Sequence, residues 1–160
     1  MPVVRRVLLD TPSRFGVVPS LRTVDGAHMS NGKEAERRVA RWLSDHPAWP
    51  YAVVTARSLS GGLARGEDLL RADGGRLPVS LEVKHVAGRA TFGRVAAWLE
   101  QAHTQADGRS YAVIHVTPGR ELRTADVYTP WDLSSPGTGW WSTPLAFWVQ
   151  QPISHTGLEF

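Results

Sequence analysis

Apolar and polar positions alternate along the stretch Val-Ser-Leu-Glu-Val-Lys at residues 79–84. This period of two is the pattern of a half-buried β-strand, whose successive side chains point to opposite faces of a sheet. On such a strand Glu82 and Lys84 point to the same side, roughly 7 Å apart along the chain. The pattern therefore predicts a strand that carries an acid and a lysine on one face. Taken alone, this pair is common on the solvent-exposed face of a strand, where charged side chains keep a protein soluble.

An Asp-Gly-Gly sequence at residues 73–75 separates this strand from a short apolar run and predicts a β-hairpin. Folding about that turn would set Asp68 opposite or nearly opposite Glu82, with Cβ atoms about 4.5–5.5 Å apart. Like charges opposed in this way are destabilising unless something offsets them, and a divalent cation with oxygen ligands would do so. Asp73 itself is explained by ordinary turn chemistry.

Helical periodicity begins at Asn31, which with Glu34 forms a capping-box-like start. Glu36 falls inside the apolar stripe of this helix, whereas Arg37 lies on the opposite face. A glutamate on a buried stripe is costly unless it is paired or bound to a metal. Two interpretations stay open: Glu36 reaches solvent or a buried arginine, or it faces Asp68 and Glu82 as a third carboxylate.

Further along the chain, a buried strand is expected at 51–55 and a flexible Gly-rich basic loop at 57–66. Thr91 is suited to cap a second helix over 92–106, and strands are expected at 111–116 and 122–128. The predicted order is α-β-β-β-α-β-β. This order is consistent with an α/β fold in which helices flank a mixed central β-sheet.

The chain has 160 residues, a net charge of +3 and no cysteine. One domain with a substantial core is expected, nucleic acid is a plausible partner, and disulfides and thiolate metal sites are excluded. The histidines lack metal-ligand spacing, and the sequence has no phosphate-binding loop or dinucleotide fingerprint. Apolar runs are too short for a membrane span or signal peptide, so the expected compartment is the cytoplasm.

Several short motifs along residues 31–133 resemble, in their order and spacing, the PD-(D/E)XK nuclease superfamily and, within it, archaeal-type Holliday-junction resolvases and their phage-encoded relatives. The resemblance rests on Gly32, Glu36, Arg37, Asp68, Glu82, Lys84 and Gln101. The chain departs from the family pattern at the first aspartate, where Gly-Glu-Asp at 66–68 replaces the usual Pro-Asp. Residues 1–30, interpreted as an N-terminal arm of unknown role, and the Trp-rich C-terminal extension 134–160 have no counterpart in the resemblance. The whole is expected to be one globular domain.

The resemblance implies a restriction-endonuclease-like core with a site for Mg²⁺ or Mn²⁺. Its ligands would be Asp68, Glu82 and the carbonyl of Val83, with Glu36 completing the site directly or through a water. Lys84 would orient or activate the attacking water. The DNA-contacting residues would be Arg37, Arg57, Ser60, Arg65, Arg89 and Gln101.

The expected function is therefore a metal-dependent DNA endonuclease that cuts four-way junctions symmetrically as a homodimer, without a nucleotide cofactor and without a membrane. Another nuclease of the same superfamily, such as a nickase or restriction-type enzyme, is the nearest alternative. A catalytically silent DNA-binding module is a further alternative, and a wholly structural protein is the last. Clustered acids beside polyanionic DNA argue against a pure binder, which has no need of them.

The aromatic cluster Trp140, Trp141, Phe147 and Trp148 is expected in the core or at a subunit interface rather than as a base-stacking platform.

Overall fold

The computed structural model describes residues 18–56 and 67–151, with side chains from residue 31 onward within these ranges. The chain divides into two compact units, Met1–Asn31 and Gly32–Phe160. Helix α1 begins at Val18 and ends at Asp45, so it starts well before the expected cap at Asn31. Pro19 lies in the first turn of this helix, where a missing N–H breaks no intrahelical hydrogen bond.

The strands form two sheets. Strands β1 (Val53–Thr55) and β2 (Leu69–Arg71) pair with each other in antiparallel orientation. The larger sheet has the order β3-β4-β5-β6, formed by Val79–His85, Ser110–Val116, Asp126–Pro130 and Trp140–Pro144. Only β3 and β4 are parallel, and helix α2 (Phe92–Ala106) makes the crossover between them. The protein is thus a mixed α/β structure, as predicted.

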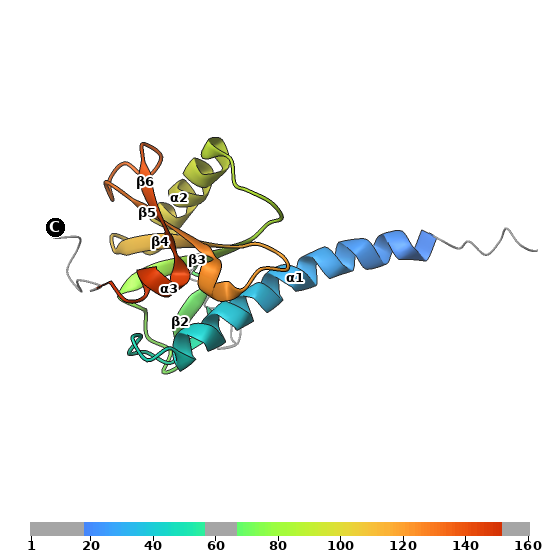
Figure 1. The fold of residues 1–160 in the computed structure, drawn as a ribbon, viewed down its shortest axis with the longest axis horizontal. Helices are drawn as coiled ribbons and strands as arrows, with labels where there is room; N and C mark the ends of the chain where they lie inside the picture. The colour runs from blue at the N-terminus through green and yellow to red at the C-terminus, as the bar shows by residue number, and fades with distance from the viewer. Residues whose placement is uncertain (1–17, 57–66, 152–160) are drawn as a thin grey trace, which may run out of the picture. The chain divides into compact units, whose positions relative to one another are not determined.

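Each face of the larger sheet is covered by different helices (Figure 1). On one face, α2 packs through Val95 and Leu99 against Tyr111 and Val113 of β4. On the other face, the buried side of α1 after Ala35 packs with the core that includes the short helix α3 (Leu145–Trp148). The alternation of side chains along each strand divides the core in two, and each half is closed by its own helix.

The predicted hairpin between β2 and β3 is wrong. The turn at Asp73 does form, since the Arg71 N–H donates to Gly75 O at 2.9 Å. However, β2 is paired with β1, and Pro78, immediately before β3, has no N–H to donate to a β2–β3 ladder. The two segments therefore meet through side chains rather than through paired backbones.

The remaining strand boundaries differ modestly from those expected. The segment predicted as one strand at 122–128 contains a short 3₁₀ helix, Leu122–Thr124, before β5 begins at Asp126. Residues 140–149, assigned at the sequence level to a C-terminal extension, supply β6 and α3, and Leu145 and Trp148 belong to the core. Within 18–56 and 67–151, no helix has the length and apolar character needed to cross a membrane.

The role of α3 in the core gives a direct stability test. Leu145→Ala removes a fully buried side chain and should lower the free energy of unfolding by about 2–5 kcal/mol. Phe147→Ala, two residues further on at a side chain that is 64% exposed, should change it by less than about 0.5 kcal/mol. Urea unfolding of both variants measures the difference. Equal effects would show that α3 is an appendage rather than part of the core.

Candidate functional site

The polar face of β3 carries a closed triangle of hydrogen bonds. Lys84 Nζ donates to Glu82 Oε1 at 2.7 Å and to Gln101 Oε1 at 2.8 Å. Gln101 Nε2 in turn donates to the same Glu82 Oε1 at 2.9 Å. Glu82 and Lys84 reach Gln101 because both point to the face that α2 covers, as the period of two requires.

Asp68, the residue immediately before β2, reaches this strand. Its Oδ2 accepts a hydrogen bond of 2.7 Å from the N–H of Val83, on the edge of β3 that has no strand partner among the described residues. The N–H and C=O of one strand residue leave the same edge, so the carbonyl of Val83 also faces the Asp68 side. The approach of Asp68 to Glu82, predicted from a hairpin, is therefore achieved by a side chain-to-backbone contact.

Electrostatics of the two acids favour a proton or a cation between them. The pKa of Glu82 is raised from its ordinary 4.5 to about 7, chiefly by burial and then by the negative charge of Asp68, while Lys84 opposes the shift. Glu82 Oε2 is buried and accepts no hydrogen bond from the described residues. Two facing carboxylates and a strand-edge carbonyl are hard oxygen donors, which suits Mg²⁺ or Mn²⁺.

The third predicted carboxylate does not join this pair. Among the described residues, no three Asp, Glu or His side chains are grouped so that they could hold a metal ion. Glu36 is buried on α1, and its helix neighbours Ala35 and Val39 pack on the face of the sheet opposite to the one that carries Glu82. The sequence pattern correctly indicated a buried Glu36, but a helical wheel does not specify which face of the sheet the helix will cover.

The DNA-contacting residues predicted from the sequence have different positions. Arg37 is exposed on α1 and lies 3.6 Å from Glu34, and Arg89 is exposed in the connection before α2. Gln101, although largely exposed, uses its amide to bond Lys84 and Glu82. Three further predictions fall outside the described residues: Arg57, Ser60 and Arg65.

Glu67 was missed at the sequence level, where it counted only as a departure from Pro-Asp. Its side chain is fully buried, it forms an ion pair with Arg109, and its Oε1 lies 3.4 Å from Arg76 Nε. The two arginines are remote in sequence, so no local spacing signals this pairing. The only signal in the sequence was an acidic residue at the start of an apolar strand, and the local sequence does not indicate which basic residue pairs with it.

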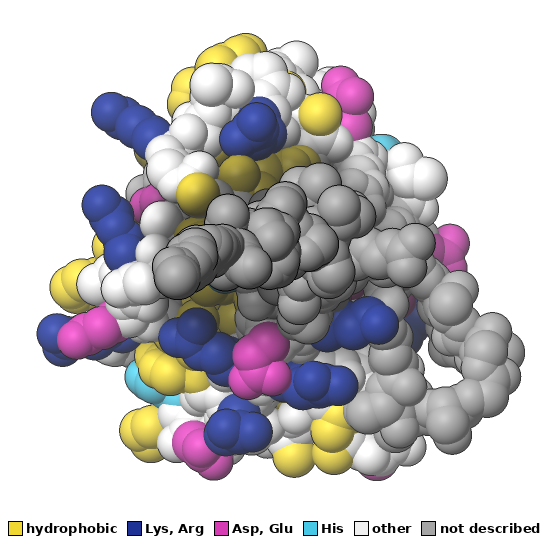
Figure 2. All heavy atoms as spheres, turned by 90° about the vertical axis from the view of Figure 1, so that its right-hand side faces the viewer, with side chains coloured by type: hydrophobic (Ala, Val, Ile, Leu, Met, Phe, Trp, Pro, Cys, Tyr) yellow, Lys and Arg dark blue, Asp and Glu magenta, His cyan; other side chains and the backbone are white. Residues whose placement is uncertain are grey.

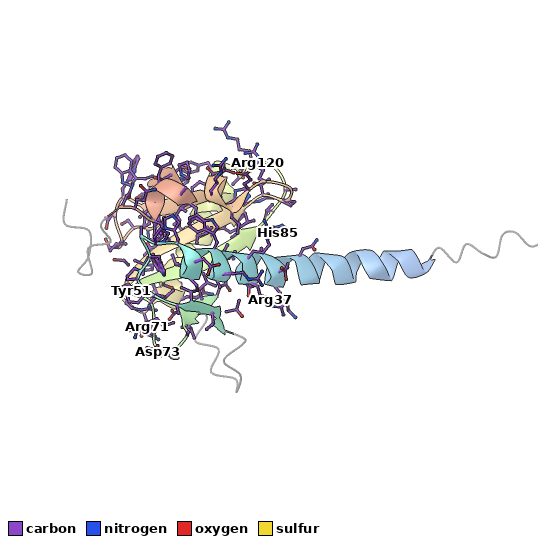
Figure 3. All side chains as sticks on the ribbon, turned by 60° about the horizontal axis from the view of Figure 1, so that its bottom comes forward. Arg37, Tyr51, Arg71, Asp73, His85 and Arg120 are labelled. Atoms are coloured by element: carbon purple, nitrogen blue, oxygen red, sulfur yellow. The ribbon has the colours of Figure 1, made fainter. Side chains whose placement is uncertain are left out.

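A shallow hollow of about 240 Å³ lies elsewhere, beside the turn that follows β2, and is lined by Pro50, Tyr51, Ala52, Arg71, Ala72 and Asp73. Figure 3 shows Tyr51, Arg71 and Asp73 gathered there, at a different place from Arg37 on α1. The Arg71 guanidinium lies over the Tyr51 ring, 5.6 Å from its centroid, and pairs with Asp73. The charges of Arg71 and Asp73 offset each other, so we place the candidate site at Asp68 and Glu82 and not in this hollow.

Comparison with protein-family models, with curated proteins and with solved structures finds no match to this chain.

The raised pKa of Glu82 predicts a pH dependence of stability in metal-free buffer containing EDTA. Between pH 4.5 and about 7 the folded chain holds a proton on Glu82 that the unfolded chain has lost. The free energy of unfolding should therefore fall as the pH rises through this window. Glu82→Gln keeps the shape of the protonated acid and should lack this part of the decline, whereas Glu121→Gln, at an exposed position, should retain it. Urea unfolding at several pH values measures the slopes, and identical slopes for wild type and Glu82→Gln would contradict the assignment.

Proposed function

We propose that the protein is a metal-dependent DNA endonuclease with a restriction-endonuclease-like core. It would act in the cytoplasm, which is that of the host cell if the protein is phage-encoded. The observation that carries the proposal is the state of Glu82. One of its oxygens accepts hydrogen bonds from Lys84 and Gln101, the other is buried without a donor among the described residues, and the charge of Asp68 raises the pKa of the group. Two neighbouring acids, one of which has a buried oxygen that accepts no hydrogen bond from the described residues, are suited to hold a divalent cation against a phosphodiester when an ordered lysine lies beside them.

Each residue of the site then has a distinct role. Asp68, Glu82 and the carbonyl of Val83 would hold Mg²⁺ or Mn²⁺, which when bound polarises a phosphoryl oxygen and lowers the pKa of water. Lys84 would donate hydrogen bonds to the attacking water or to the developing negative charge of the phosphate. Gln101 holds the lysine and the glutamate together and acts as a positioning residue. Glu36, which is not grouped with these two acids among the described residues, would complete the site only through a water.

Exposed arginines supply the sequence-independent attraction for the phosphate backbone. On the face that Figure 2 shows, Lys and Arg side chains are spread over the surface with acidic ones between them. Within the described part of the chain, five of the surface arginines have no acidic partner: Arg38, Arg41, Arg89, Arg94 and Arg120. We include Arg37, Arg57, Ser60 and Arg65 as further phosphate contacts.

The substrate that we favour is a four-way DNA junction, cut symmetrically by a homodimer, because two equivalent cuts call for two equivalent sites. The edge strand β6 supports a dimer. Trp141 is more than half exposed, and β6 contains no charged residue of the kind that protects open sheet edges. A nickase or restriction-type nuclease would use the same site, and a catalytically silent DNA-binding module would leave the acids without a role.

Substitutions in the site separate an enzyme from a DNA-binding module. Glu82→Gln and Asp68→Asn should abolish Mg²⁺-dependent cleavage while junction binding in EDTA is kept or strengthened, because negative charge beside the phosphates is removed. Lys84→Ala should lose cleavage but still bind Mn²⁺, since a lysine donates hydrogen bonds and does not coordinate the ion.

Measurement of the cleavage rate also tests the positioning role of Gln101. Gln101→Ala should slow cleavage by roughly 10- to 100-fold, the usual effect of removing a partner of a metal ligand. Gln105→Ala, one turn further along α2, is the matched control and should cut at the wild-type rate. Cleavage rates on a four-way junction and on a linear duplex, with Mg²⁺ and with EDTA, decide the matter. Variants of Asp68 and Glu82 that fold and still cut at the wild-type rate would refute the proposal.

The dimer is tested at the β6 edge. Trp141→Lys places a charge on the exposed edge and should convert a dimer into a monomer at micromolar concentration, because edge strands with lysine resist pairing. Thr104→Lys adds the same charge at an exposed position of α2 and should leave the dimer intact. Light scattering gives the molar mass. A wild-type protein that is already monomeric while it cuts junctions would remove the dimer from the proposal.

A further inference from the structure

A buried ion-pair group lies immediately before Asp68 in the chain. Glu67 has no exposed side-chain surface, and its Oε1 pairs with both Arg109 and Arg76. Arg76 extends the group to the surface through Asp107, at 3.0 Å between Nη1 and Oδ2. Because a carboxylate that is fully removed from water requires positive partners, the two arginines fix the place of the Glu67 side chain.

Arg109 joins three separate segments. Its Nε donates to the carbonyl of Ala106, the last residue of α2, at 3.1 Å, and its Nη1 donates to the carbonyl of Leu77 before β3 at 2.8 Å. Its Nη2 donates to Glu67 at the entry to β2. The planar guanidinium fork sets the directions of these hydrogen bonds, so the entries to β2 and β3 are held in one geometry.

Asp68 follows Glu67 directly in the chain, and its carboxylate lies near the carboxylate of Glu82, which carries the same charge. Its carboxylate accepts the N–H of Val83 and faces Glu82, whose negative charge repels it. Its backbone carbonyl accepts the N–H of Ala56 at 2.8 Å. The position of the Asp68 carboxylate against β3 therefore also depends on how firmly the backbone at 67–68 is held.

We propose that Glu67 and Arg109 are positioning residues that hold Asp68 against the β3 edge and so pre-organise the cation site. This inference rests on the proposed function in one respect, since it assigns the held carboxylate a ligand role.

The Val83 amide reports the position of Asp68 without reference to catalysis, because Asp68 Oδ2 is its hydrogen-bond acceptor. Replacing both partners, as in Glu67→Met with Arg109→Met, substitutes apolar groups of similar volume and can leave the overall fold stable. In this double variant hydrogen exchange at the Val83 amide, followed by NMR, should become at least about tenfold faster. The Ile114 amide in the central strand should keep its wild-type rate and serves as the reference for global unfolding.

The control is Glu121→Met with Arg123→Met, which removes an exposed ion pair and should leave both amides unchanged. If the double variant at 67 and 109 does not fold, the single change Glu67→Gln takes its place. It keeps the side-chain shape and should give a smaller acceleration in the same direction. Val83 exchange that equals the wild-type rate in a folded variant overturns the inference.

A calorimetric titration with Mn²⁺, in the absence of DNA, gives the second readout. The affinity of the double variant should fall by roughly 10- to 100-fold relative to wild type, with no change in the control pair. An unchanged affinity would contradict the positioning role. A wild-type protein that binds no Mn²⁺ would instead refute the proposed function, and the exchange of Val83 would then decide the positioning role by itself.

Discussion

Two carboxylates of like charge, Asp68 and Glu82, face each other at the edge of strand β3, and the rest of the site is arranged around their repulsion. In water such a pair would separate, but burial and backbone contacts prevent this here. Lys84 offsets one side of Glu82, and the N–H of Val83 offsets one oxygen of Asp68. The negative charge of Asp68 contributes to the raised pKa of Glu82, and a proton or a divalent cation relieves repulsion of this kind.

The fold brings the contributors together from separate parts of the chain. The parallel pairing of β3 and β4 requires a crossover, and α2, which makes it, lays Gln101 over the polar face of β3. The end of the same helix provides Ala106, which Arg109 joins to Glu67 and so to the start of β2. The same helix thus contacts Lys84 and Glu82 through Gln101 and reaches the Arg109–Glu67 pair through its last residue, Ala106.

Local periodicity was sufficient to predict several elements. Helix α2 has the predicted bounds, and the strand with alternating Glu82 and Lys84 was identified from its period of two. The meeting of Asp68 with Glu82 was predicted for the wrong reason, because a turn signal at Asp73 does not determine which strand β2 will pair with.

Long-range contacts were beyond the reach of the sequence pattern. Glu67 and Arg109 are 42 residues apart, and the packing of α1 on the face away from Glu82 depends on the sheet as a whole. The Trp-rich segment was expected in the core or at a subunit interface: Trp148 is in the core, as predicted, whereas Trp141 is exposed on β6. The early start of α1 was not predicted, because Pro19 is compatible both with a loop and with the first turn of a helix.

The central claim is that Asp68 and Glu82 share a divalent cation. Crystals grown with Mn²⁺ and measured at the manganese absorption edge test it most directly. The account predicts one strong anomalous peak within about 2.0–2.6 Å of oxygens from Asp68, Glu82 and the carbonyl of Val83. If both carboxylates are well ordered at a saturating Mn²⁺ concentration and no anomalous peak lies between them, the shared cation site is contradicted. The same holds if Lys84 Nζ occupies that position.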